Sequence, residues 1–157
     1  MKSNTRYWLF KSEPDAFSID DLKRVNTSLW DGVRNFQVRN LMRDEMKVGD
    51  KALFYHSSCK DVGVVGEMEI VGEAKPDPTQ FDPKSEYFDK RSKAENPLWL
   101  GVTVGYTSTF PNLVPLSRLR TEPSLKNLTI LRKGNRLSIT EITKGEYERI
   151  VKLSTNN

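Results

Sequence analysis

The chain of 157 residues is 36% hydrophobic and 29% charged, and its 25 Lys and Arg against 21 Asp and Glu give a formal net charge of +4. This length and composition predict one folded domain over residues 1–157 and exclude a disordered or fibrous chain. One cysteine, one histidine and no run of about 18 apolar residues exclude an internal disulfide, a zinc site with the usual ligands and a membrane-spanning helix.

The first predicted elements are a strand and a short helix. Residues 6–11 form an aromatic-rich apolar run, which predicts a strand that is buried on both faces. Ser12 and Glu13 follow at the end of this strand, where binding sites are commonly built. Residues 18–22 predict a short helix because a serine can cap its N-terminus and acidic residues occupy its first turn. Residues 26–28 are polar and break the helix.

Residues 30–44 predict a turn followed by a helix. Asp31 and Gly32 are a strong turn signal because glycine adopts positive φ without steric cost. Asn35 can cap the helix by accepting a hydrogen bond from a backbone N–H of its first turn. The residues expected to face the core recur at helical spacing and are Val38, Leu41, Met42 and Met46.

The same stretch carries side chains that suit a base attached to a phosphate backbone. Trp30 offers a plane for stacking, and Asn35 offers a paired donor and acceptor. The cations that can attract phosphate, together with the asparagine bordering them, are Arg34, Arg39, Arg43 and Asn40. A core tryptophan beside a solvated basic helix face is the alternative interpretation of this pattern.

Two strands follow, joined by a polar loop. Residues 51–56 and 62–71 predict these strands, and His56 lies at the end of the first. Gly63 and Gly66 fit bulges or sharp coiling of the second strand. Both features are typical of a strongly curved sheet.

The remaining segments alternate between loops and short elements. The expected order is a proline-rich surface excursion over 74–96, strands over 98–104 and 106–110, a short helix from Pro115, helical turns over 125–131 and a final helix opened by a capping box at 143–146. About five or six strands with helices packed around them indicate an α+β domain built on a small β-barrel. Barrel closure also removes exposed sheet edges.

Signatures of common enzyme classes are absent. The chain has no nucleophile elbow, P-loop, dinucleotide fingerprint or zinc-deaminase pattern. His56 next to Ser57 could pair a base with a nucleophile, but neighbouring residues on a strand point to opposite faces. We therefore predict no catalytic residues, and we expect neither a metal nor a cofactor.

Long segments of the chain resemble the EVE domain family. They are residues 7–14, 30–40, 47–50, 54–57, 76–82 and 134–138, which together span nearly the whole chain. The resemblance implies a PUA-like β-barrel related to the YTH and ASCH domains. These folds hold a nucleic-acid base in a pocket between the barrel and a neighbouring helix.

The resemblance also implies which residues bind. The implied base pocket contains Ser12, Glu13, Trp30, Asn35, Tyr55, His56 and Ser57. The implied contacts to phosphate or to the rim are Arg34, Arg39, Asn40, Arg43 and Arg136. A Trp30→Ala variant is then expected to lose selectivity for a modified base while keeping its fold.

The implied activity is recognition of a modified base, with methylated or hydroxymethylated cytosine in DNA as the first candidates and modified RNA as another. We expect a non-catalytic monomer that binds nucleic acid and no membrane. Nuclear members of the family carry a basic N-terminal extension, whereas the first strand is predicted here from residue 6, so we expect a cytoplasmic protein. Two alternatives stay open: an enzyme that uses His56 or Glu13 for acid–base chemistry on a modified base or nucleotide, and a small-molecule-binding module that uses the same cleft.

Overall fold

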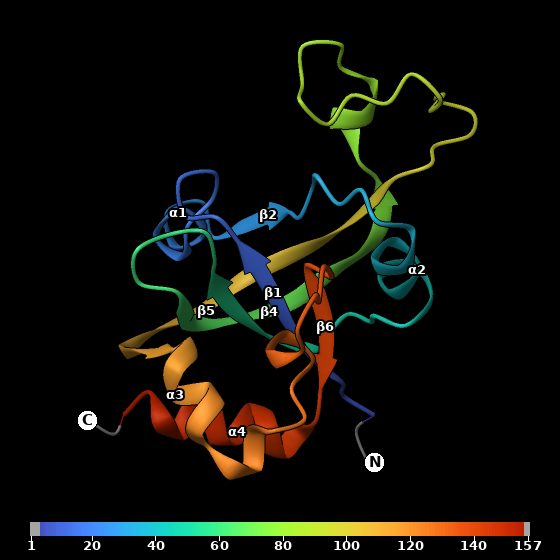
Figure 1. The fold of residues 1–157 in the computed structure, drawn as a ribbon. Helices are drawn as coiled ribbons and strands as arrows, with labels where there is room; N and C mark the ends of the chain where they lie inside the picture. Colours follow the sequence, from blue (N-terminus) through green and yellow to red (C-terminus); the bar gives the residue numbers. More distant parts are fainter. Residues whose placement is uncertain (1–3, 156–157) are drawn as a thin grey trace.

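One six-stranded sheet runs through residues 4–155, the part of the chain that the computed structural model describes (Figure 1). Its strands are β1 (Tyr7–Ser12), β2 (Thr27–Leu29), β3 (Lys51–His56), β4 (Gly63–Pro76), β5 (Leu100–Pro115) and β6 (Ile139–Ile142). The helices are α1 (Ile19–Val25), α2 (Phe36–Asp44), α3 (Leu116–Thr121) and α4 (Lys144–Leu153), with 3-10 helices η1 (Pro78–Phe81), η2 (Pro123–Leu125) and η3 (Thr129–Leu131). The strand order is β2-β5-β4-β3-β1-β6; β1 and β3 are parallel, and the other pairs are antiparallel.

The two faces of the sheet bury two separate cores. Alternation along β3 sends Ala52 and Phe54 into a first core, which α1 and α2 cover. It sends Leu53 and Tyr55 into a second core, which α3 and α4 cover. In Figure 1, α3 and α4 lie together on one side of the sheet. Each fully buried apolar side chain stabilises the fold by about 1.5–3 kcal/mol, so both helix layers are held mainly by burial.

The α+β composition and the number of strands match the expectation, but the closed barrel does not. Hydrogen bonding places β2 at one edge of the sheet and β6 at the other, and no ladder joins them within residues 4–155. These edge strands have only 3 and 4 residues. Register shifts along β4 and β5 coil the middle of the sheet, but edges this short form no common ladder. The sheet is therefore strongly curved and open.

Several elements also differ from the predicted ones, chiefly because short strands are hard to recognise in the sequence. Residues 27–29 form β2 where a break was expected, and residues 139–142 form β6 where no strand was predicted. Strands this short contain too little alternation to be recognised. β5 is continuous over 16 residues where two strands were expected. The helical turns expected over 125–131 are η2 and η3.

The predicted helix starts are confirmed. The side chain of Ser18 accepts from the backbone N–H of Asp21 in a capping box at the start of α1. Asn35 accepts from the N–H of Val38 at the start of α2. Thr143 opens α4 with a second capping box. Because each cap satisfies an orphan backbone donor locally, such residues identify helix N-termini from sequence alone.

An excursion over residues 77–99 leaves the sheet between β4 and β5 and projects beyond its end (Figure 1). Gln80 is fully buried and ties its two ends together. Its Nε2 donates to the carbonyls of Asp77 and Trp99, both at 2.7 Å, and its Oε1 accepts from the N–H groups of Leu98 and Trp99. The excursion is thus anchored at its base by one buried amide whose polar atoms are all bonded.

Gly66 lets β4 and β5 approach closely, so any side chain added at this position should destabilise the fold. A Cβ at Gly66 would lie 2.4 Å from the carbonyl oxygen of Ser108 and 3.1 Å from Cδ1 of Ile19. We expect Gly66→Ala to lower the free energy of unfolding by about 1–3 kcal/mol, because the strands must separate. Urea unfolding measures this change.

Gly145 supplies the matched control for this prediction. In the first turn of α4, a Cβ at Gly145 would meet only Oγ1 of Thr143, at 3.9 Å. Gly145→Ala is expected to raise the free energy of unfolding by about 0.4–1 kcal/mol, because alanine gives the unfolded chain fewer conformations than glycine. Equal stabilities of the two variants would contradict the steric argument.

Candidate nucleic-acid interface

A cleft of about 720 Å³ opens where the parallel strands β1 and β3 end side by side. Its wall comes from the segment after β1, the turn after β2, the loop after β3, the excursion and the loop before β6. The N–H of Ser57 donates to the carbonyl of Ser12 at 2.9 Å, and the N–H of Lys11 donates to the carbonyl of Ser138 at 2.8 Å. These bonds fix three of the five wall segments to one another. The volume lies in the range of small-ligand sites.

Aromatic side chains line one part of the cleft. Trp30, Phe17 and Tyr87 belong to this wall. Trp30 is only 8% exposed, because its ring packs edge-on against Phe10 at 5.0 Å and Phe54 at 5.5 Å in the first core. The indole is therefore held within the core and exposes too little surface for a base to stack on it.

Charged side chains are divided between the wall and the rim. Three carboxylates line the cleft, from Glu13, Asp31 and Glu86. Partial burial raises the pKa of the Tyr87 hydroxyl, and the negative charges of these three carboxylates raise it further. The cations of the cleft are Lys11 and Arg136. The wall near Tyr87 therefore favours hydrogen-bond donors over anions.

The turn after Trp30 is held by Asp77, which is fully buried at the base of the excursion. Its Oδ2 accepts from the N–H of Gly32 at 2.8 Å and from Nη1 of Arg34 at 3.0 Å. Its Oδ1 accepts from the N–H and the hydroxyl of Thr79. Burial opposes ionisation of Asp77, but these hydrogen bonds outweigh it and lower its pKa. Gly32 adopts φ +81° directly against the ring of Tyr87, where a Cβ would lie 2.8 Å away.

Arg34 is saturated by contacts within the protein. Nε and Nη2 donate to the carbonyl of Tyr87, Nη2 also to Thr79, and Nη1 to the carbonyl of Val33 and to Asp77. A guanidinium has five N–H donors, and these five bonds use all of them. Arg34 was expected at a phosphate, but the structure gives it the role of joining the turn to the excursion.

Five of the residues expected at the site line the cleft: Ser12, Glu13, Trp30, Ser57 and Arg136. The hydroxyl of Ser12 donates to the carbonyl of Phe17 at 2.6 Å, so its oxygen can still accept a hydrogen bond. No other polar side chain within residues 4–155 bonds the Ser57 hydroxyl, which is therefore free to donate or accept. The assignment of these five to base binding stays a prediction.

Tyr55 and His56 were expected in the pocket but lie outside its wall. Tyr55 is buried in the second core, on the opposite face of the sheet from Trp30, and burial raises its pKa to about 12. Nε2 of His56 accepts from the N–H of Ile19 at 3.1 Å at the start of α1. Burial lowers the pKa of His56, which fits a neutral acceptor there. Tyr55 lies outside the cleft because alternation along β3 turns it to the opposite face of the sheet. His56 lies outside it because its ring bonds the start of α1.

The other four expected residues serve α2 and its neighbours. Asn35 is the N-cap. Arg39 donates to the carbonyl of Leu98 and to Oδ1 of Asn40, while its guanidinium lies 4.8 Å from the Phe36 ring centroid. Arg43 is exposed and paired with Asp44. None of the four lines the cleft.

Sequence reasoning missed the parts of the wall that come from far along the chain. Tyr87 and Glu86 belong to the excursion, whose sequence shows no periodicity, so nothing indicated which of its side chains would reach the turn. Phe17 and Asp31 also line the cleft. Asp31 directly follows Trp30 and could have been included, but it was interpreted only as a turn residue.

Residues 4–155 hold no group of three or more His, Cys, Asp or Glu side chains arranged to bind a metal ion. No helix in the same residues is long and apolar enough to cross a membrane.

The fold and the cleft define an α+β domain with a polar, aromatic-lined site at the ends of two parallel strands. The sequence model of the EVE domain family matches residues 6–153, and the chain belongs to this family. Thymocyte nuclear protein 1 from Homo sapiens is 40% identical over 98% of this chain and 76% of its own length.

Solved structures agree with this assignment. A protein from Pseudomonas syringae is 43% identical, with a TM-score of 0.91 over 94% of this chain and 99% of its own. Human THYN1, solved in complex with DNA containing 5-methylcytosine, is 38% identical, with a TM-score of 0.91 over 98% and 99% of the two chains. A YTH domain from Zygosaccharomyces rouxii, at 14% identity and TM-score 0.57, shares the fold.

Proposed function

We propose that this protein is a non-catalytic module that binds nucleic acid and reads a modified base in the cleft, with 5-methylcytosine in DNA as the first candidate. The observation that carries the proposal is the human THYN1 complex with 5-methylcytosine DNA, whose protein matches this chain over 98% of its length. The cleft supports it, because it combines an aromatic wall with hydroxyls and carboxylates that can bond a base edge. Monomeric state and cytoplasmic location stay predictions.

The cleft can favour a methylated base by burial. One methyl group gains about 0.8 kcal/mol when it leaves water for an apolar wall. Phe17, Trp30 and Tyr87 provide such a wall. Extrusion of a base from a duplex costs about a few kcal/mol, so a single-stranded or mispaired base enters more easily.

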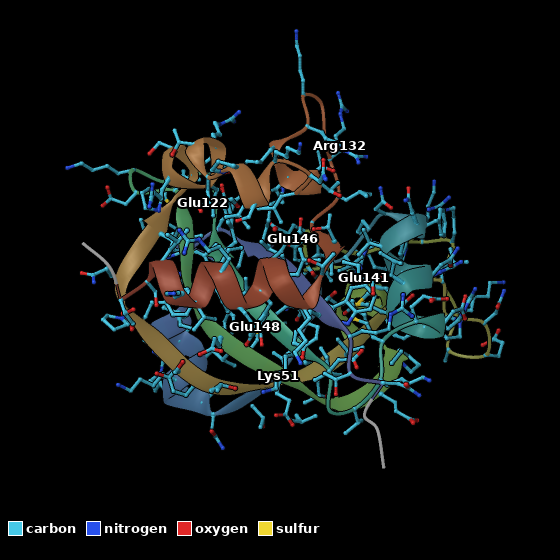
Figure 2. All side chains as sticks on the ribbon, turned by 90° about the horizontal axis from the view of Figure 1, so that it is seen from below. Lys51, Glu122, Arg132, Glu141, Glu146 and Glu148 are labelled. Carbon is cyan, nitrogen blue, oxygen red and sulfur yellow. The ribbon has the colours of Figure 1, made fainter. Side chains whose placement is uncertain are left out.

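A phosphate backbone can follow the basic side of the rim. Arg136 and Lys11 line the cleft, and Arg132 and Lys133 lie on the same loop as Arg136, in front of β6. Figure 2 shows Arg132 on this loop, beside the layer of α4. Within residues 4–155, none of these four cations is paired with a carboxylate. They are therefore available for phosphate, in contrast to Arg34 and Arg43.

The test is an affinity series on matched oligonucleotides. Single- and double-stranded DNA is titrated with cytosine, 5-methylcytosine or 5-hydroxymethylcytosine at one position, at two salt concentrations. Tighter binding of a modified strand at both salts supports base reading. Equal, steeply salt-dependent binding of all strands would reduce the activity to a basic surface. Absence of binding would favour the small-molecule alternative.

Arg136→Ala is expected to weaken binding of every oligonucleotide by about tenfold, because one charge-assisted contact to phosphate is lost. The slope of log affinity against log salt should fall by about 1. The ratio between modified and unmodified strands should stay unchanged, because phosphate contacts carry no base information.

Arg43→Ala is the matched control, because Arg43 is exposed and paired with Asp44 on α2. It should leave both the affinity and the salt slope unchanged. If Arg43→Ala weakens binding as much as Arg136→Ala, the proposed path of the backbone is wrong.

The enzyme alternative required His56 or Glu13 as an acid or base. His56 is engaged through Nε2 with the N–H of Ile19, which leaves Glu13 as the one of the two that lines the cleft. We expect modified oligonucleotides to be recovered unchanged after incubation with the protein. Mass spectrometry of the recovered strand measures this, and a product of altered mass would establish catalysis.

A further inference from the structure

The methyl group alone cannot identify 5-methylcytosine. Thymine carries the same methyl at the same ring position, so an apolar wall accepts both bases equally. The two bases differ at position 4, where cytosine has an amino donor and thymine a carbonyl acceptor. An acceptor placed at the 4-amino group therefore lets a protein tell methylcytosine from thymine.

Asp31 provides an unused acceptor in the cleft. Its side chain lines the wall next to Trp30. Beyond its own backbone N–H, no donor within residues 4–155 bonds its carboxylate. Arg34 is a neighbouring cation, but its five N–H donors are all used elsewhere. The negative charge of Asp31 is thus incompletely compensated at the wall of the cleft.

The backbone that carries this carboxylate is fixed on both sides. The N–H of Trp30, just before Asp31, donates to the carbonyl of Val102 at 2.8 Å. The N–H of Gly32, just after it, donates to buried Asp77, also at 2.8 Å. A short side chain on a backbone held at both neighbours loses little freedom when it binds a ligand.

The surroundings of Asp31 favour a donor over an acceptor. The side chain reaches solvent on one side, yet desolvation by the surrounding protein raises its pKa. The negative charge of Asp77 raises it further, while Arg34 opposes the shift. An N–H donor from a base would offset this penalty, whereas a carbonyl oxygen would add to it.

We propose that Asp31 is the specificity-determining residue of the cleft, whose carboxylate accepts from the 4-amino group of a cytosine-type base and rejects thymine. This inference rests on the proposed function, because it assumes that a base enters the cleft. Its discrimination between an amino and a carbonyl group is expected to be about tenfold or more in affinity.

The test uses short single-stranded oligothymidylates with one central base, which is 5-methylcytosine, cytosine or thymine. The unsubstituted strand is itself the thymine comparator, and single strands avoid the cost of opening a duplex. Wild-type protein should prefer the 5-methylcytosine strand over the thymine strand by about tenfold or more. Asp31→Asn should reduce this preference to within about threefold, because a carboxamide can turn either its oxygen or its NH₂ toward the base.

Asp61→Asn is the matched control, since it removes one exposed carboxylate charge from a residue outside the cleft wall. It should keep the wild-type preference. Asp31→Ala, which removes the acceptor altogether, should lower affinity for the 5-methylcytosine strand and raise affinity for the thymine strand, because the carboxylate no longer opposes the thymine carbonyl. Both Asp31 variants should fold, because the side chain is exposed and makes no contact that holds the turn.

The outcomes separate this inference from the function on which it rests. Wild-type protein that prefers 5-methylcytosine over cytosine but binds thymine equally well would overturn the role of Asp31 and leave base reading intact. An unchanged preference in Asp31→Asn, or an equal loss in Asp61→Asn, would overturn it as well. No binding to any strand would overturn the function itself.

Discussion

Replacing Asp77 with Asn is expected to lower the free energy of unfolding by about 3–5 kcal/mol, the largest effect of any charge-removing substitution considered. Asp77 is fully buried and accepts four hydrogen bonds, from Gly32, Arg34 and two groups of Thr79. Asparagine keeps the size of the side chain but turns one acceptor into a donor. That donor would face N–H groups, and Arg34 would lose its partner charge.

Urea unfolding measures the loss, with Asp61→Asn as control. Asp61 is an exposed carboxylate in the loop before β4, so its change should stay within about 0.5 kcal/mol. Base reading should fail in Asp77→Asn even under conditions where the protein is folded, because the turn that carries Asp31 loses one of its anchors. A folded Asp77→Asn variant with wild-type affinity and stability would contradict the role of this carboxylate.

The same residue gives a pH dependence with a definite sign. The pKa of Asp77 is lower in the folded protein than its ordinary value of 3.8. A lowered folded-state pKa stabilises the protein above the unfolded-state pKa, and this contribution is lost as the pH falls through the folded-state value. Wild-type stability should therefore decline more steeply than that of Asp77→Asn as the pH falls below about 4.

Trp30→Ala is expected to destabilise the fold by about 3–5 kcal/mol, the usual cost of truncating a buried tryptophan. This corrects the expectation that the substitution would leave the fold intact. Trp30 is 8% exposed and packs edge-on against three rings of the first core, from Phe10, Phe17 and Phe54. Thermal or urea unfolding measures the change.

Phe88→Ala is the control, because Phe88 is 43% exposed on the excursion and should cost less than about 1 kcal/mol. The contribution of Trp30 to binding is better tested with Trp30→Phe, which keeps an aromatic edge at the cleft with a smaller cavity. Selectivity that is unchanged in a folded Trp30→Phe variant, with Phe17 and Tyr87 intact, would restrict the role of Trp30 to the core.

Local signals in the sequence predicted the parts of the structure that depend on local physics. Ser18, Asn35 and Thr143 marked three helix starts because each cap bonds a backbone N–H only a few residues away. A turn was expected at Asp31 because glycine tolerates positive φ; Gly32 does adopt φ +81°, but residues 30–35 form no hydrogen-bonded turn. The strands of six or more residues were found, whereas the shorter β2 and β6 depend on partners far along the chain.

The candidate site was predicted in region but only partly in residues. Neighbouring positions in the chain led to the segment after Trp30, and five of the expected residues line the cleft. Arg34 shows why others do not line the cleft: a free arginine and a saturated one have the same sequence signature. Its partners Asp77, Thr79 and Tyr87 are separated from it by more than 40 positions, and only the folded chain brings them together.

The strand order has a consequence for the synthesis of the protein. β1 forms near the start of the chain, yet one of its edges pairs with β6, and Tyr7 lies opposite Ile142. A ribosome makes about 5–20 residues per second, so this edge stays unpaired for several seconds in the nascent chain. Such distant pairing predicts slow folding for a domain of this size. It also makes β1 the segment most in need of protection from aggregation until the final helix emerges.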